Sequence, residues 1–180
     1  MANASLVLTV IGTDRPGLVE TLANTVADHG ASWLESRMAH LAGHFVGLLR
    51  VRVAESRAAE LALALRGLEV RGLRVIVETA LGPGPDDSTP RLHLELVGLD
   101  RPGIVRDVSR AIAERGVNVE ELASHTSSAP MSGETLFHAE ASLRLPRDAN
   151  PDELRAALEK LANELMVELS LEPTTGPEIR

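Results

Sequence analysis

The tetrapeptide Asp14-Arg15-Pro16-Gly17 occurs again as Asp100-Arg101-Pro102-Gly103, 86 residues further along the chain. A four-residue match could arise by chance, but the same offset aligns residues well outside the tetrapeptide. The aligned pairs are Gly12 with Gly98, Leu18 with Ile104, Val19 with Val105, Ala27 with Ala113, Gly30 with Gly116 and Glu35 with Glu121. We therefore interpret the 180-residue chain as two copies of one small domain.

The first copy begins with an apolar, β-branched segment, Leu6–Gly12, which predicts a buried strand. Pro16 fits the first turn of a helix whose apolar face repeats every four residues and which ends at Gly30. Two strands and a second helix capped by Ser56 follow, and a fourth strand closes the copy. The predicted strands are Ser32–Leu41, Phe45–Val53 and Leu73–Leu81, and the second helix carries Leu61, Leu65 and Leu68.

The second copy repeats this order of elements. Leu92, Leu94 and Leu96 alternate with other residues as in a half-buried strand, and a helix follows up to Gly116. A hairpin, a helix beginning at Asn150-Pro151 and a last strand complete it. The hairpin strands are Val117–Ser127 and Thr135–Leu145, and the last strand contains Val167, Leu169 and Leu171.

Each copy is thus βαββαβ, which predicts an α+β, ferredoxin-like domain. In this fold an antiparallel four-stranded sheet carries both helices on one face. We expect a first domain at residues 1–81, a linker at 82–89, a second domain at 90–172 and a polar tail at 173–180. The uncovered sheet faces and edge strands favour association of the copies and a homodimer.

Composition excludes several classes of function. A net charge of −8 and an aromatic content of 2% disfavour direct binding of nucleic acid and of anionic membranes. The absence of Cys excludes disulfides and thiolate chemistry. No apolar run is long enough to span a bilayer, and the N-terminus lacks the basic segment of a signal peptide. We expect a cytoplasmic protein.

The repeated tetrapeptide lies where a strand ends and a helix begins. The free amides of a helix N-terminus can hold a carboxylate, and Gly allows its backbone to approach closely. The Asp side chain could bind an ammonium group, so the loop suits a small amino acid. The alternative is that both loops are plain turns, with the Asp as a helix cap and the Arg solvated.

Other groupings of reactive residues are weaker. His40 and His44 could face each other across a hairpin, but no third metal ligand has a recognisable spacing, and we expect no metal site. Ser109 and Ser124-His125 have no catalytic context, and the pair Glu120-Glu121 is interpreted as a solvated strand end. No nucleotide-binding motif is present. We therefore expect no catalytic residues and no cofactor.

A βαββαβ unit of this size, with Asp-Arg-Pro-Gly where its first strand meets its first helix, resembles the ACT domain, a regulatory module that binds small amino acids. Two such units with no catalytic domain resemble the glycine cleavage system transcriptional repressor family, over residues of about 5 to 172. The stretches that carry this resemblance are Gly12-Thr13-Asp14-Arg15-Pro16-Gly17 and Asn118-Val119-Glu120-Glu121-Leu122.

In ACT domains the ligand lies between the tetrapeptide loop and the polar residue that opens the second strand, often across an interface. The resemblance therefore implies a site at Asp14-Arg15-Pro16-Gly17 with Ser32, and another at Asp100-Arg101-Pro102-Gly103 with Asn118. ACT binders commonly have Asn where this chain has Asp. Asn118 offers both donor and acceptor groups, so the second copy is the better candidate.

The resemblance implies a regulatory protein that binds a small amino acid, glycine in particular. Its partner would be a protein such as a transcriptional activator of glycine-cleavage genes. The alternative is a free-standing pair of ACT domains that regulates a metabolic enzyme or another target, with a different effector or none. An enzyme in its own right is disfavoured.

Overall fold

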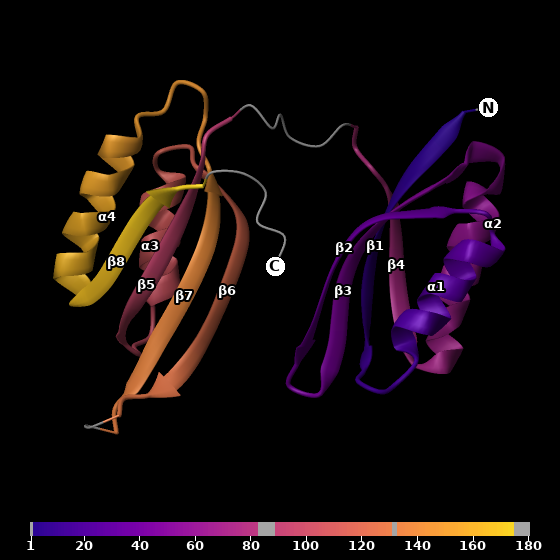
Figure 1. Ribbon diagram of the computed structural model, residues 1–180, viewed down its shortest axis with the longest axis horizontal. Helices are drawn as coiled ribbons and strands as arrows, with labels where there is room; N and C mark the ends of the chain where they lie inside the picture. Colours follow the sequence, from indigo (N-terminus) through magenta and orange to yellow (C-terminus); the bar gives the residue numbers. More distant parts are fainter. Residues whose placement is uncertain (1, 83–88, 131–132, 175–180) are drawn as a thin grey trace. The chain divides into compact units, whose positions relative to one another are not determined.

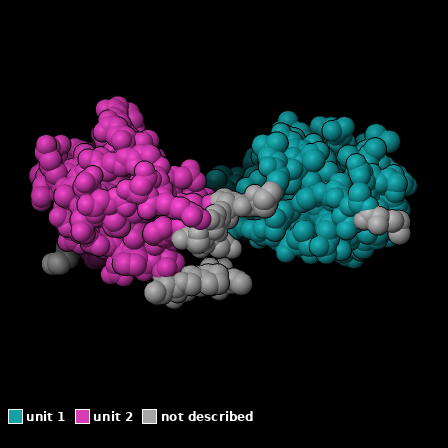
Figure 2. Space-filling view, turned by 90° about the horizontal axis from the view of Figure 1, so that it is seen from above, with its two compact units in different colours: residues 1–84 teal, residues 85–180 magenta. Residues whose placement is uncertain are grey.

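The computed structural model describes residues 2–82, 89–130 and 133–174 of the chain. The chain forms two units with separate cores, one from each copy of the repeat (Figure 1). They divide between residues 84 and 85 (Figure 2), and we call them unit 1 and unit 2. Most of the predicted linker at 82–89 and of the predicted tail at 173–180 lies outside the described residues. The domain boundaries therefore remain a prediction.

Unit 1 has the predicted βαββαβ order, with one short additional helix. Its antiparallel sheet has the order β2-β3-β1-β4. Its elements are β1 (Asn3–Thr13), α1 (Leu18–Asp28), β2 (Ser32–Leu41), β3 (His44–Ala54), α2 (Glu55–Arg66), the 3-10 helix η1 (Gly67–Arg71) and β4 (Leu73–Thr79).

Unit 2 repeats this topology with the sheet order β6-β7-β5-β8. In both units the helices lie on one face of the sheet (Figure 1), which confirms the ferredoxin-like α+β fold. The elements of unit 2 are β5 (Arg91–Leu99), α3 (Ile104–Ala113), β6 (Asn118–Ser128), β7 (Thr135–Arg144), α4 (Pro151–Leu165) and β8 (Val167–Pro173).

Each unit has its own core between the sheet and its helices. In β1, every second residue from Leu6 to Val10 is buried, and Leu49 and Val51 of β3 pack beside them. Helix α1 covers these residues with Leu18, Leu22 and Val26, at the spacing that places them on one face. The cores contain only apolar residues among the buried residues described, so apolar burial is the main source of stability.

The helix ends follow the prediction in part. Asn150 caps α4, because its side-chain oxygen accepts a hydrogen bond from the Asp152 amide at 2.9 Å. Ser56 does not cap α2, because the helix already begins at Glu55 and has Ala54 at its N-cap position. Leu68 belongs to η1 rather than to α2. No helix in the described ranges is long and apolar enough to cross a membrane.

The repeated Gly12 and Gly98 have no room for a side chain where the first strand of each unit pairs with the beginning of the last strand. A Cβ atom on Gly12 would lie 2.5 Å from the carbonyl oxygen of Gly72. A Cβ atom on Gly98 would lie 2.3 Å from a methyl carbon of Val167. These two glycines are therefore required by packing in the sheet.

We predict that Gly12→Ala destabilises unit 1 by about 1–3 kcal/mol, because the backbone of Gly72 must move to admit the methyl group. Gly67→Ala is the matched control, since Gly67 has a helical φ of −62° and open space around it. This control should change stability by no more than about 1 kcal/mol, in the stabilising direction. Urea unfolding measures both, and equal stabilities for the two variants would contradict the packing argument.

Candidate functional site

The two tetrapeptide loops have the same backbone geometry. The last residue of each loop is the N-cap of the following helix and has a left-handed conformation, with φ 88° at Gly17 and 99° at Gly103. Pro16 and Pro102 lie in the turn before the helix rather than in its first turn. Neither helix has a side-chain hydrogen bond at its cap, so the alternative interpretation of the Asp residues as caps is wrong.

The geometry leaves amide donors at both helix starts. The first helical hydrogen bonds run from Thr21 to Gly17 and from Asp107 to Gly103, each at 2.9 Å. The amides of residues 18–20 and 104–106 precede these bonds and have no acceptor within their own helix. Three donors beside the positive end of the helix dipole form the kind of cradle that binds a carboxylate.

The backbone of each Asp anchors its loop to the neighbouring hairpin. The Asp14 amide donates to the Gly43 carbonyl at 3.0 Å, and the Asp100 amide donates to the Thr135 carbonyl at 2.8 Å. Both Asp residues are exposed. The Asp14 carboxylate lies 3.8 Å from the His40 imidazole, an ion pair when His40 is protonated.

The arginine of the unit 1 loop, Arg15, makes a structural contact. The Arg15 guanidinium donates to the carbonyl of Arg71, the last residue of η1. It thus joins the loop to the segment that leads into β4. The interpretation of Arg15 as simply solvated is therefore wrong.

The charges around the two helix starts differ. In α3, Arg106 contacts both oxygens of the Asp107 carboxylate, at 2.9 and 3.3 Å. The hydrogen bond from Arg106 lowers the pKa of Asp107 below its ordinary value, with further attraction from Arg106, Arg110 and Arg101. Each helix has one acidic residue in its first turn, Glu20 in α1 and Asp107 in α3, but only α3 also carries arginines, Arg106 and Arg110. A bound anion is therefore favoured more in unit 2 than in unit 1.

The polar residues that open the second strand lie far from these loops within each unit. Asn118 pairs with Arg144, which pairs with Arg91 at the beginning of β5. Asp100 follows Leu99 at the other end of β5. The nine residues of β5 span eight steps, so its two ends lie about 26 Å apart at the usual rise of about 3.3 Å per residue.

Unit 1 shows the same separation. Ser32 pairs with Arg52, which pairs with Ser5 near the beginning of β1, whereas Asp14 follows the end of that strand. Neither unit brings its own loop and its own polar residue together. A ligand as small as an amino acid therefore cannot contact both groups within one unit.

Glu120 has a role that the sequence did not indicate. A β-bulge between Val119 and Glu121 directs Glu120 toward Arg91, at 2.9 Å, and toward Arg144. The Glu120 side chain is only 18% exposed, so its interpretation as part of a solvated strand end is wrong. The bulge shifts the alternation by one residue, so that Val119 and Leu122 both line a cavity in the core, but this strand has too few apolar residues for the shift to be recognised from the sequence alone.

The histidines do not form the predicted facing pair. His40 pairs with Phe45 and His44 pairs with Leu41, so the two imidazoles belong to opposite faces of the sheet. No group of three or more potential metal ligands occurs among the described residues. His125 and His138 do form a pair, and their rings stack with centroids 4.7 Å apart.

Comparison with known proteins identifies both units. Models of the ACT domain match residues 4–77 and residues 93–163. The chain belongs to the ACT domain family. The glycine cleavage system transcriptional repressor of Escherichia coli is 26% identical over 168 residues, which cover 92% of this chain and 88% of that protein. This relationship supports a regulatory ACT protein.

Two crystal structures share the tandem ACT fold over nearly the whole chain. A protein of unknown function from Galdieria sulphuraria is 29% identical, with a TM-score of 0.85, covering 97% of this chain and 100% of that one. A protein provisionally assigned as a glycine cleavage system transcriptional repressor is 21% identical, with a TM-score of 0.75, covering 98% and 100%. The second similarity concerns the fold alone.

The contact between Arg106 and Asp107 in the second ACT domain gives a measurable prediction. Asp107 should titrate below its usual value of about 3.9, and Arg106→Gln should raise its pKa toward that value. Since the folded-state pKa is the lower one, this pairing stabilises the protein above about pH 4 and is lost as the pH falls through the folded pKa. Carboxyl NMR titration measures the shift. An unchanged Asp107 titration in the variant would contradict the assignment, with Arg155→Gln in α4 as the control.

Proposed function

We propose that the chain is a regulatory protein that senses a small amino acid, glycine in particular. It passes effector occupancy to a protein partner such as a transcriptional activator of glycine-cleavage genes. The observation that carries this proposal is the similarity to the Escherichia coli repressor, which extends over both ACT domains. Occupancy acts on the partner only if the effector binds one arrangement of the ACT domains better than another.

The proposed effector site has two halves. One is the loop Asp100-Arg101-Pro102-Gly103 with the amides of residues 104–106, and the other is Asn118 of a second chain. The helix start binds the carboxylate of the effector, Asp100 binds its ammonium group and Asn118 closes the site. This arrangement makes the protein a homodimer, and the separation of about 26 Å within one unit is the reason.

The corresponding groups of the first ACT domain form the weaker site. Asp14-Arg15-Pro16-Gly17 offers the same amides, but Arg15 is bonded to the carbonyl of Arg71, and α1 has no arginine to offset Glu20 as Arg106 offsets Asp107 in α3. Ser32 has a shorter side chain than Asn118 and cannot offer the paired donor and acceptor of an amide.

A second function is favoured by one observation. Both loops carry Asp where ACT binders commonly carry Asn, which changes the charge presented to the ligand. A free-standing ACT pair that regulates a metabolic enzyme through a different effector would follow from this change. A thermal-shift screen against the twenty amino acids separates the two functions, because only the first predicts stabilisation by glycine.

The proposal includes a non-enzymatic role and a cytoplasmic location. Similarity to a transcriptional repressor and to regulatory domains supports the non-enzymatic role. Control of transcription then acts through the protein partner, since a net charge of −8 opposes contact with DNA.

We predict that Asp100→Ala weakens glycine binding about ten- to hundredfold, because a charged hydrogen bond worth about 1.5–3 kcal/mol is lost. Asp14→Ala is the matched control and should reduce affinity much less. Isothermal calorimetry on the full chain compares them, with circular dichroism to verify folding. Equal losses in both variants would contradict the preference for the second ACT domain. Wild-type protein that binds no amino acid would contradict the sensing function.

We also predict that the purified protein does not bind DNA at physiological salt. The repulsion expected from its net charge is independent of sequence, so a glycine-cleavage promoter and an unrelated duplex should behave alike. A gel-shift titration without any partner measures this. A shift by this protein alone, weakened by added salt, would overturn regulation through a protein partner.

A further inference from the structure

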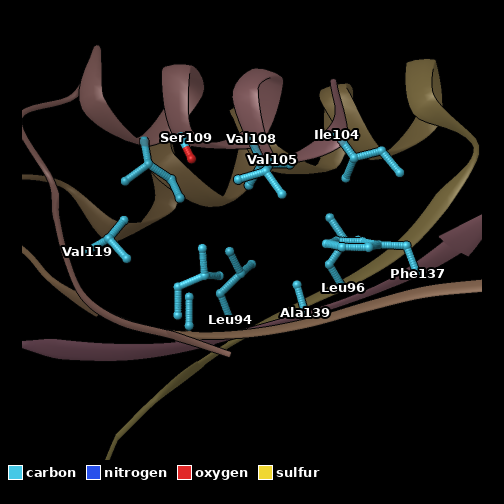
Figure 3. Close-up of a pocket in the computed structure, with 12 residues that line it drawn as sticks. Leu94, Leu96, Ile104, Val105, Val108, Ser109, Val119, Phe137 and Ala139 are labelled. Carbon is cyan, nitrogen blue, oxygen red and sulfur yellow. The ribbon is translucent and has the colours of Figure 1, made fainter. Parts of the chain in front are cut away.

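Unit 2 contains a small apolar cavity between α3 and the sheet (Figure 3). Its volume is about 30 Å³, and Ile104, Val108, Leu94 and Leu96 are among the residues that form its walls. Ser109 supplies the hydroxyl group drawn at its edge (Figure 3). A buried water needs two to four polar partners, so walls of this kind suit an apolar group better than water.

Unit 1 fills the corresponding space with its own side chains. Val119 in β6 corresponds to Trp33 in β2, since each precedes the bulge and pairs with a buried residue of the central hairpin strand. Ala141 corresponds to Leu49, since each pairs with the equivalent Leu of the first strand. Leu49 is 1% exposed and Trp33 packs against the core of unit 1. The two replacements remove most of an indole ring and an isopropyl group from unit 2.

A third replacement lies on the same strands. Met38 packs over Gly47 in unit 1, where a Cβ on that glycine would lie 3.0 Å from the Met38 Cγ. The equivalent residue of unit 2 is Ser124, which pairs with Ala139. Ser124 is exposed and is not among the residues that line the cavity. Unit 2 therefore lacks the thioether side chain that covers this part of the sheet in unit 1.

The cavity lies next to two exposed apolar residues that could admit a ligand. Val105 on α3 is 42% exposed and Leu122 on β6 is 50% exposed, and both line the cavity. Leu122 stands where unit 1 has Ser36, but half of it remains in solvent. Leu122 at the edge of the cavity therefore replaces only part of the side-chain volume that is missing from the core of unit 2.

We propose that unit 2 binds a small molecule through a short, branched alkyl group that enters this cavity. Unit 1 identifies the chemistry of the occupant, because the groups that fill the same place there are aliphatic or aromatic. Glycine has no such group and cannot fill this cavity, although the cavity adjoins the amino-acid site proposed above, whose amides include those of Ile104 and Val105. The occupant is uncharged where it contacts the walls, since the cavity offers nothing to neutralise a charge.

Xenon and 2-methylpropan-1-ol are suitable probes, one a sphere and the other a branched alkyl group. The test uses the full chain with labelled Leu, Val and Ile methyl groups, followed by NMR during titration with each probe. We expect saturable shifts at Ile104, Val108 and Leu122, without equivalent shifts at Leu18, Leu22 and Val26 in unit 1. Shifts in neither unit, or equal shifts in both, would overturn the proposal.

Exchange of residues between the units gives the matched variants. Ala141→Leu gives unit 2 the leucine that unit 1 has at Leu49. It should fill the cavity, weaken probe binding at least tenfold and raise the melting temperature. Ala141→Val serves the same purpose if the larger side chain prevents folding. Leu49→Ala should create a second probe site in unit 1. Unchanged probe binding in the Ala141 variants, or no new site with Leu49→Ala, would overturn the proposal.

A second copy of the chain is the competing occupant of the cavity. In that case probe binding would increase as the protein is diluted from dimer to monomer, as measured by light scattering on the same samples. Such a dependence on protein concentration would overturn a small-molecule site. Glycine binding at Asp100 is measured separately by calorimetry, so failure of one site is distinguishable from failure of the other.

Discussion

The path of the helix after the first strand of each unit determines what that unit can bind. Strands β1 and β2 both pair antiparallel with β3, so they run parallel, and α1 must return along the sheet between them. The loop before α1 and the residue that opens β2 therefore lie at opposite ends of the sheet. The same holds for α3 and β6 in unit 2. Within one unit, a ligand as small as an amino acid therefore cannot contact both groups.

The two copies have diverged around this shared framework. Unit 1 uses its polar and bulky residues for its own structure, since Arg15 bonds the Arg71 carbonyl and Trp33 packs against the core. Unit 2 has cationic residues around the start of α3, an ion-paired Glu120 at the bulge and an open cavity beneath the helix. These differences are the reason that both proposed ligand sites lie in unit 2.

Much of the fold could be predicted because the sequence contains two copies of the same pattern of elements. The 86-residue repeat and its apolar periodicity gave the order of elements, and Asn150 gave a helix start confirmed by its side-chain bond. Features that depend on contacts across strands could not be predicted. The bulge at Glu120 and the cavity above Ala141 both depend on which residues face each other. The periodicity of residues within one strand does not say which residues of the neighbouring strand lie opposite them.

The sharing of one site between two chains is tested most directly by mixing two defective variants. Asp100→Ala and Asn118→Ala each remove a different half of the proposed site, so each protein alone should lose most of its glycine binding. After unfolding and refolding together, chains of the two kinds form dimers with one intact site, and calorimetry should show partial recovery at wild-type affinity. No recovery in the mixture, with both variants folded and dimeric, would contradict a site built from two chains.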